Sequence, residues 1–175
     1  MGLLEINSNI QKQLEDGKSR ENIFQELAAD SPANAPKLAY SLASIPYAGL
    51  RSKYIKHNAL LFIFLLMLAG LSLAAEWPID FQQSTIFIVI KIFIPLVFSY
   101  FVYHFHGGVY RLLGIWCIID LLESLLLLDF TTGVSLSRVA VLIVIIFLAF
   151  FIAAKVFPNL GILGPKKDSQ GRYLL

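Results

Sequence analysis

Three ionisable residues stand inside long apolar stretches of the chain, and their types make them the first candidates for chemistry. Lys91 lies in the apolar run 86–103, and Asp120 and Glu123 lie in the run 109–128. A lipid-exposed charge at such depth costs at least ~2.5–3.5 kcal/mol on membrane-insertion scales. This charged layer could therefore be a proton or ion relay, a substrate site, or a structural ion pair that fixes the packing of the helices.

The positions of these residues within their runs favour one pairing. Lys91 lies six residues after the start of its run near Thr85, and Glu123 lies six residues before the end of its run near Asp129. Both are therefore about 9 Å from the same side of the membrane, at ~1.5 Å per helical residue. Because consecutive spans joined by a short loop are antiparallel neighbours, we predict an ion pair between Lys91 and Glu123, with both side chains facing the interior. Asp120 lies three residues before Glu123 and shares its helix face. Its carboxyl could be protonated, could pair with Arg138, or could face water.

A proline lies one turn after Lys91 in the same run. Pro95 has no backbone N–H, so the carbonyl of Lys91 lacks its usual helical partner. We predict a helix kink at Pro95, which would open space and leave a free acceptor at the level of the charged layer.

The elements that position these residues follow from composition and from the length of the apolar runs. The chain has 175 residues, of which 57% are hydrophobic and 15% charged, with a mean hydropathy of +0.71. Soluble domains carry about 25% charged residues, and about 18 or more consecutive apolar residues predict a membrane span. We predict an all-α membrane protein whose domain 58–157 is an antiparallel bundle of four transmembrane helices, at 58–75, 86–103, 109–128 and 139–157.

The basic residues predict how the chain is oriented, because Lys and Arg gather on the cytoplasmic side of membrane proteins. We predict that both termini are cytoplasmic, that 47–57 is a basic juxtamembrane linker, and that 158–175 is a short basic cytosolic tail. The expected location is a cell membrane, bacterial inner or plasma, crossed several times. The residues expected to anchor this topology are Arg51, Lys53, Lys56, Arg111, Lys155, Lys166 and Lys167.

Residues 1–46 have ordinary polarity, and we predict that they form a cytosolic module of about three short helices. Ser19 is expected to cap the second helix, and Pro36 to lie in the first turn of the third. Four basic residues face six acidic ones, a net charge of −2, which argues against nucleic acid as a partner. The residues expected on the buried faces are Leu3, Ile6, Ile10, Leu14, Ile23, Phe24, Leu27, Ala28, Leu38, Leu42 and Ile45.

Two histidines are weak candidates for a metal site. His104 and His106 would face nearly opposite sides of a helix, and they could converge only if the helix unwinds toward Gly107 and Gly108. No cysteine or carboxylate cluster accompanies them to complete a metal site. The single cysteine, Cys117, lies inside a predicted span and cannot form a disulfide framework. We expect neither a cofactor nor a resident metal.

These features favour a non-enzymatic accessory or interaction protein, because no phosphate loop and no nucleophile with an obvious base is evident. A subunit of a larger complex and an immunity-type inhibitor of a membrane-active partner both belong to this class. The expected partners are the lipid bilayer and either a membrane protein or further copies of the chain. The alternative is a small oligomeric transporter or channel, coupled to ions or protons, with Lys91, Asp120 and Glu123 along its pathway.

Overall fold

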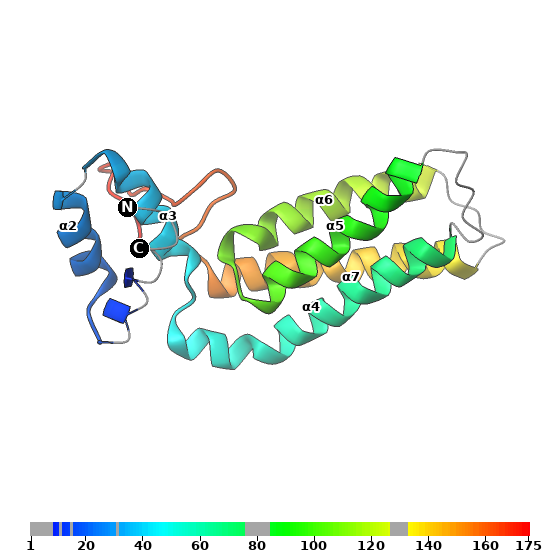
Figure 1. Ribbon diagram of the computed structural model, residues 1–175, viewed down its shortest axis with the longest axis horizontal. Coiled ribbons are helices and arrows are strands. Elements are labelled where there is room, and N and C mark those ends of the chain that lie inside the picture. Colours follow the sequence, from blue (N-terminus) through cyan, green and yellow to red (C-terminus); the bar gives the residue numbers. More distant parts are fainter. Residues whose placement is uncertain (1–8, 11, 15, 31, 76–84, 127–132) are drawn as a thin grey trace.

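The computed structural model describes residues 9–10, 12–14, 16–30, 32–75, 85–126 and 133–175. These residues form helices, so the predicted all-α class is confirmed. Figure 1 shows a small helical module at one end of the molecule and a bundle of longer helices beside it, with the C-terminal end of the chain in the module. The elements in chain order are α2 (Arg20–Asp30), the 3-10 helix η1 (Pro32–Asn34), α3 (Ala35–Ser44), α4 (Ala48–Ala75), α5 (Thr85–Tyr103), α6 (Gly107–Leu126) and α7 (Gly133–Val156).

The module forms where local signals in the sequence are strong. The Ser19 hydroxyl oxygen accepts the backbone N–H of Asn22 at 3.2 Å, which confirms Ser19 as the cap of α2. Pro36 lies in the first turn of α3, where its missing N–H costs no helical bond. Leu3 and Ile6 lie outside the described residues. The fully buried side chains of the module are Ile10, Ile23, Leu38, Ala39 and Leu42, and Leu14, Phe24, Leu27, Ala28 and Ile45 pack around them.

The four long helices run alternately in opposite directions (Figure 1). α4 ends at Ala75 and α5 at Tyr103, as predicted, and α6 and α7 end within two residues of their predicted limits. The largest difference is at the start of α4. The segment 47–57, predicted as a linker, is helical from Ala48 onward and is continuous with the apolar part of α4. The helix is not interrupted there because no proline follows Pro46 until residue 78.

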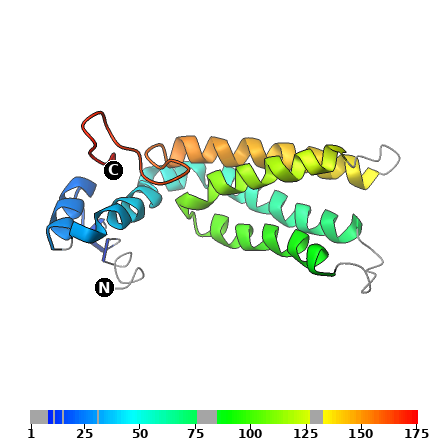
Figure 2. The ribbon, with the colours of Figure 1, turned by 90° about the horizontal axis from the view of Figure 1, so that it is seen from above.

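The bundle is not evenly packed. α4 packs along α5 and α7, and α6 packs along α7, whereas α5 and α6 touch over only a short stretch although they are consecutive (Figure 2). The expectation that every consecutive pair forms close neighbours therefore fails for α5 and α6. The central side chains of the core are Leu61, Leu65, Leu68, Leu113, Cys117, Leu142, Ile145, Ala149 and Ile152.

Two of the helices are long and apolar enough to span a membrane, among the residues that the structure describes. They are the 27 residues Gly49–Ala75 of α4 and the 24 residues Gly133–Val156 of α7. The apolar stretch of α5, Val89–Tyr103, is shorter, and α6 carries Arg111, Asp120 and Glu123 within its 20 residues. α4 and α7 are thus candidate spans that suggest a membrane location.

The segment after α7 is structured and returns to the module. Tyr173 packs edge-on against Phe24 with ring centroids 5.8 Å apart, and Leu175 is buried in the module core. A tight turn precedes this contact: the Asp168 carboxylate accepts the backbone N–H groups of Gln170 and Arg172. The N–H of Arg172 lowers the pKa of the Asp168 carboxyl, and the Arg172 side chain adds to this effect. The segment predicted as a short basic tail is therefore part of the module.

Candidate functional site

The charged layer lies at the end of the bundle remote from the module. Lys91 projects from α5 and Glu123 from α6, and Lys91 Nζ lies 3.1 Å from Glu123 Oε1. The pair expected from equal depth is present. Its side chains are 32% and 51% exposed, so the prediction that both face the interior is wrong. The pair connects α5 and α6 at a partly exposed position, since these two helices do not pack closely along their length.

The second carboxylate of the charged layer belongs to a buried pair. Arg138 Nη2 of α7 lies 2.7 Å from Asp120 Oδ1, and the two side chains are 12% and 8% exposed. Of the alternatives open for Asp120, pairing with Arg138 is the one observed. Three residues along a helix leave about 60° between two side chains. That angle is enough for Asp120 to meet α7 while Glu123 meets α5.

A small polar cavity of about 120 Å³ joins the two pairs. This volume is large enough to hold water. Asp120 Oδ2 and Arg138 Nε are buried without a hydrogen-bond partner among the described residues. One oxygen of a well-paired carboxylate thus remains unused beside a cavity that could hydrate it. The cavity is lined by Ala75, Lys91, Asp120, Glu123, Ser124, Val134, Ser135 and Arg138.

Pro95, predicted to kink its helix at this level, is buried inside α5. The helix continues through Pro95 without interruption, from Thr85 to Tyr103.

A second polar cluster, without charges, ties the helices together at the module end of the bundle. The Asn58 side-chain amide of α4 donates to the Val102 carbonyl of α5 at 2.8 Å. The Tyr110 hydroxyl of α6 donates to Asn58 Oδ1 at 2.6 Å, and the Tyr110 ring stacks on Phe157 just beyond α7. Val102 lies in the last turn of α5, and its carbonyl also accepts the backbone N–H of Phe105 at 2.9 Å. This cluster therefore fixes the module ends of the helices relative to one another.

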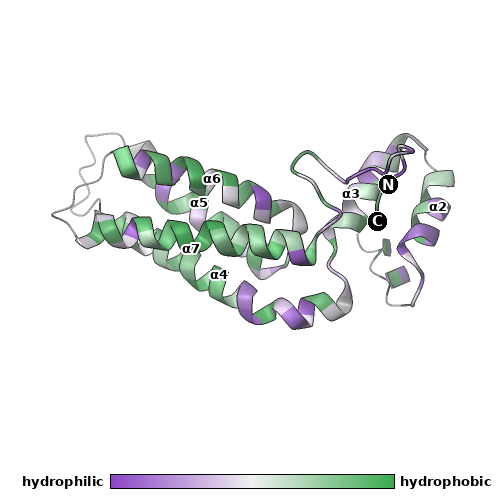
Figure 3. Cartoon of the chain, turned by 180° about the vertical axis from the view of Figure 1, so that it is seen from behind, coloured by the Kyte–Doolittle hydropathy of each residue, from purple (hydrophilic) through white to green (hydrophobic). Residues whose placement is uncertain are grey.

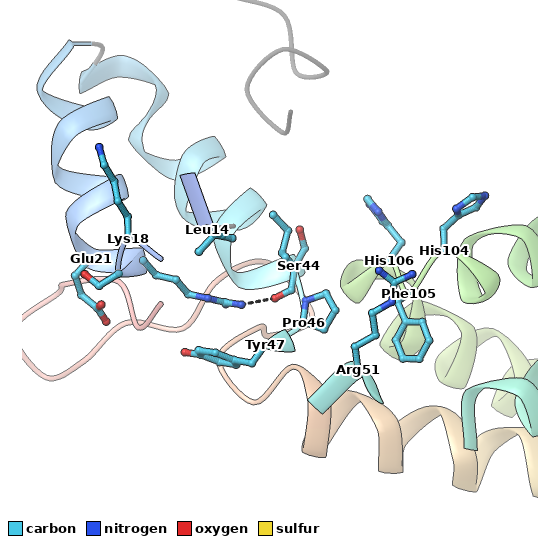
Figure 4. Close-up of a pocket in the computed structure, with 13 residues that line it drawn as sticks. Leu14, Lys18, Glu21, Ser44, Pro46, Tyr47, Arg51, His104, Phe105 and His106 are labelled. Atoms are coloured by element: carbon cyan, nitrogen blue, oxygen red, sulfur yellow. Dashed lines mark hydrogen bonds between the residues drawn. The ribbon is translucent and has the colours of Figure 1, made fainter. Parts of the chain in front are cut away.

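A second, larger cavity lies between the module and the bundle, and we name it the junction pocket (Figure 4). It has a volume of about 920 Å³, within the upper range of small-molecule sites. Three separate stretches of chain enclose it. They contribute Leu14, Lys18, Ser19, Arg20 and Glu21; Ser44, Ile45, Pro46, Tyr47 and Arg51; and His104, Phe105 and His106.

Arg20 supports the wall of the junction pocket on the module side. Its guanidinium donates to the carbonyls of Leu42 at 2.8 Å and Ile45 at 2.7 Å, at the C-terminal end of α3. The same group lies 3.8 Å from the centroid of the Tyr47 ring. Burial lowers the pKa of Arg20 from its ordinary value, and the nearby Tyr47 and Glu21 oppose that shift. The Arg20 guanidinium thus fixes the C-terminal end of α3 and the chain that follows it.

The turn between α5 and α6 supplies the opposite wall. Phe105 has a φ of +56°, a conformation usually taken by glycine after a helix. Two bonds close the turn: the N–H of His106 donates to the Phe101 carbonyl at 3.1 Å, and that of Phe105 to Val102 at 2.9 Å. The Phe105 side chain is buried, and the Arg51 guanidinium lies 5.5 Å from its ring centroid. Burial of the ring offsets a backbone strain of about 1–3 kcal/mol.

The histidines of this turn do not form a metal centre with other residues. α5 ends at Tyr103, so His104 and His106 lie outside regular helix, and both side chains are exposed. The structure contains no group of three or more His, Cys, Asp or Glu suited to a metal among the residues it describes. The histidines lie on the rim of the junction pocket, a position that the sequence analysis did not foresee.

The chain matches no protein-family model, no curated protein and no solved structure.

Proposed function

We propose that this chain is an integral membrane protein with four transmembrane helices and both ends in the cytoplasm. We further propose that it acts as a non-enzymatic accessory or interaction protein. The module, which combines 9–47 with the segment after α7, is then its cytosolic contact surface. The class still includes a complex subunit and an immunity-type inhibitor of a membrane-active partner.

Helix length supports spans for α5 and α6 in addition to the two candidate spans. α5 has 19 residues and α6 has 20, which correspond to about 28 and 30 Å at 1.5 Å per residue. The hydrocarbon core of a bilayer is about 30 Å thick. α5 lies alongside α4, and α6 lies alongside α7 (Figures 1 and 2).

The surface of the bundle supports the same arrangement. Phe93 of α5, Ile119 of α6 and Phe147 of α7 are more than half exposed, and Figure 3 shows hydrophobic residues along all four helices. Monomeric soluble proteins rarely expose apolar patches larger than a few hundred Å². A lipid environment removes that cost. Further exposed apolar side chains are Ile63 and Met67 of α4, Leu96 of α5, Leu122 of α6 and Ile143 of α7.

The distribution of basic residues supports the proposed orientation. The 14 Lys and Arg residues include only two, Lys91 and Arg138, at the end of the bundle remote from the module. All the predicted topology anchors, which are Arg51, Lys53, Lys56, Arg111, Lys155, Lys166 and Lys167, belong to the module end. By the positive-inside rule this end faces the cytoplasm.

The observation that carries the accessory role is the pairing of the charged layer. Lys91 and Arg138 each bind one carboxylate, Glu123 and Asp120 respectively. Both pairs are neutral overall, so each stabilises the position of one helix against another and leaves no unpaired charge among these four side chains. A structural role for the layer leaves the module as the surface available for partners.

A small ion- or proton-coupled transporter or channel is the second candidate, and one specific observation favours it. Asp120 Oδ2 has no hydrogen-bond partner among the residues that the structure describes, and Asp120 lines a polar cavity. A carboxylate that exchanges protons with cavity water would require such an oxygen. This pathway would use Lys91, Asp120 and Glu123 in an oligomer.

Labelling of single cysteines tests the topology. In a Cys117→Ala background, Leu136→Cys is expected to react with a membrane-impermeant maleimide from outside intact cells. Ser52→Cys is expected to react only after permeabilisation, because it lies at the module end. Both positions are exposed in the structure, so a difference in labelling reports their side of the membrane. Labelling of both from the same side would contradict the four-span arrangement.

Flux measurements test the accessory role against the transporter. Folded wild-type protein in proteoliposomes is expected to pass neither protons nor monovalent cations above the level of empty vesicles under an imposed gradient. Glu123→Gln is the informative variant, since its pair is half exposed and its loss is expected to leave the fold intact. Wild-type flux that disappears in Glu123→Gln would replace our proposal by the transporter.

A further inference from the structure

We propose that the junction pocket binds a phosphate-bearing anion through Arg51, His104 and His106. This site is separate from the charged layer and does not depend on the accessory role. The proposed membrane location matters only for one of the two possible sources of the ligand, as described below.

The charges around the junction pocket single out Arg51. Lys18 is paired with Glu26 at 2.8 Å, and Arg20 donates to two carbonyls. Arg51 forms no ion pair with any described residue and is exposed, and Glu21 is the single acidic side chain among the lining residues that the structure describes. An arginine left with a free guanidinium beside a cavity offers paired N–H donors that suit two phosphate oxygens.

The turn at Phe105 holds the other donors next to Arg51. His104 and His106 flank Phe105, and Figure 4 shows both imidazoles and Arg51 at the same side of the junction pocket. The buried Phe105 ring lies beneath the Arg51 guanidinium and restricts where it can go. α6 begins directly after His106 and has no acidic residue in its first turn. The positive end of its helix dipole therefore adds to the attraction for an anion.

The size of the junction pocket indicates a phosphate attached to an organic body. A volume of about 920 Å³ far exceeds that of a bare phosphate, and Leu14, Ile45 and Pro46 give it apolar walls. A soluble phosphomonoester and the headgroup of an anionic phospholipid both present such a phosphate group. Arg51 and the two histidines lie at the module end of the bundle, the level of the headgroups in the proposed topology.

The experiment compares two probes that share a glycerol phosphate group and differ in their acyl chains. The protein is placed in phosphatidylcholine nanodiscs, and the imidazole signals of its three histidines are followed by NMR. One titration adds glycerol 3-phosphate, and the other uses nanodiscs with increasing phosphatidic acid. We expect saturable shifts of the His104 and His106 signals with at least one probe, while His57 of α4, outside the pocket, stays unchanged. The effective probe identifies the source.

Matched variants decide whether the binding is specific. Arg51→Gln is expected to weaken the apparent affinity about tenfold, as for the loss of one charged, two-point contact. Lys56→Gln removes the same charge from the same helix at an exposed position outside the pocket, and its effect is expected to stay within about twofold. Arg51→Lys retains the charge but lacks the planar guanidinium, so its apparent affinity is expected to lie between those of the wild type and Arg51→Gln. It serves as the second variant if Arg51→Gln folds poorly.

Two results would overturn the proposal. The first is the absence of saturable His104 and His106 shifts with both probes. The second is a parallel shift of His57, or an equal weakening by Lys56→Gln, because either would indicate general attraction to a basic surface. Neither result bears on flux, so failure of this proposal is distinct from failure of the proposed function.

Discussion

Replacing Asp120 with asparagine is expected to lower the free energy of unfolding by about 3 kcal/mol or more. The change leaves the Arg138 side chain, which is only 12% exposed, without a compensating charge. Its Nε already lacks a hydrogen-bond partner among the described residues, so the surroundings offer little to replace the carboxylate. Thermal or denaturant unfolding of the purified protein in detergent micelles measures this loss.

Two further variants separate this effect from a general loss of charge. Asp120→Asn combined with Arg138→Gln removes both members of the pair and is expected to recover most of the stability, because no unpaired charge remains. Glu123→Gln breaks the half-exposed pair with Lys91 and is expected to cost at most about 1 kcal/mol. Equal losses for Asp120→Asn and Glu123→Gln would show that burial does not distinguish the two pairs.

The two ion pairs differ in how well they could be predicted from the sequence. Depth along each helix predicted that Lys91 meets Glu123, because depth depends only on residue spacing. Whether a side chain faces the interior depends on which helices pack together, and spacing contains no such information. The sparse contact between α5 and α6 leaves Glu123 exposed and directs Asp120 to α7.

The positions of the helices could be predicted, whereas the module could be predicted only in part, because local sequence signals do not report contacts between remote residues. Apolar runs, Ser19 and Pro36 are local signals, so the positions of the helices follow from short stretches of sequence. The contact of Tyr173 with Phe24 joins residues about 150 positions apart in the chain and has no local signal. The turn residues Gly164, Pro165 and Gly171 are a local signal that this segment is more than a basic tail, and the prediction did not use them.

The junction pocket was missed because its walls come from three stretches that are remote in sequence. His104 and His106 were considered only as a weak metal pair, which could converge if helical geometry ended toward Gly107 and Gly108. The positive φ of Phe105 ends that geometry. A glycine at position 105 would have indicated such a turn, whereas a phenylalanine does not. Gly107 and Gly108 lie just beyond the turn and serve another purpose.

That purpose leads to the second large expected effect: Gly107→Ala should destabilise the joint between module and bundle by about 1–3 kcal/mol. A Cβ atom at Gly107 would lie 2.8 Å from the Ser44 carbonyl oxygen and 2.7 Å from the Phe157 ring. The backbone at the end of α3 and the buried Phe157 ring cannot both withdraw, so α3 must move from the start of α6. Faster hydrogen exchange of the α3 amides, together with a lower unfolding temperature, measures this change.

Gly108 provides the control, because a Cβ atom there would meet the end of a side chain and not backbone. A Cβ at Gly108 would meet the hydroxyl end of Tyr40, a side chain that is 38% exposed and free to rotate outward. Gly108→Ala is therefore expected to change stability by no more than about 0.5 kcal/mol. Gly49→Ala, in the first turn of α4 with nothing within 4 Å, should be neutral or stabilising by up to about 1 kcal/mol. If Gly107→Ala behaved like these two, the module would be linked to the bundle by the chain alone, and the junction pocket would lose the rigid walls that its proposed ligand requires.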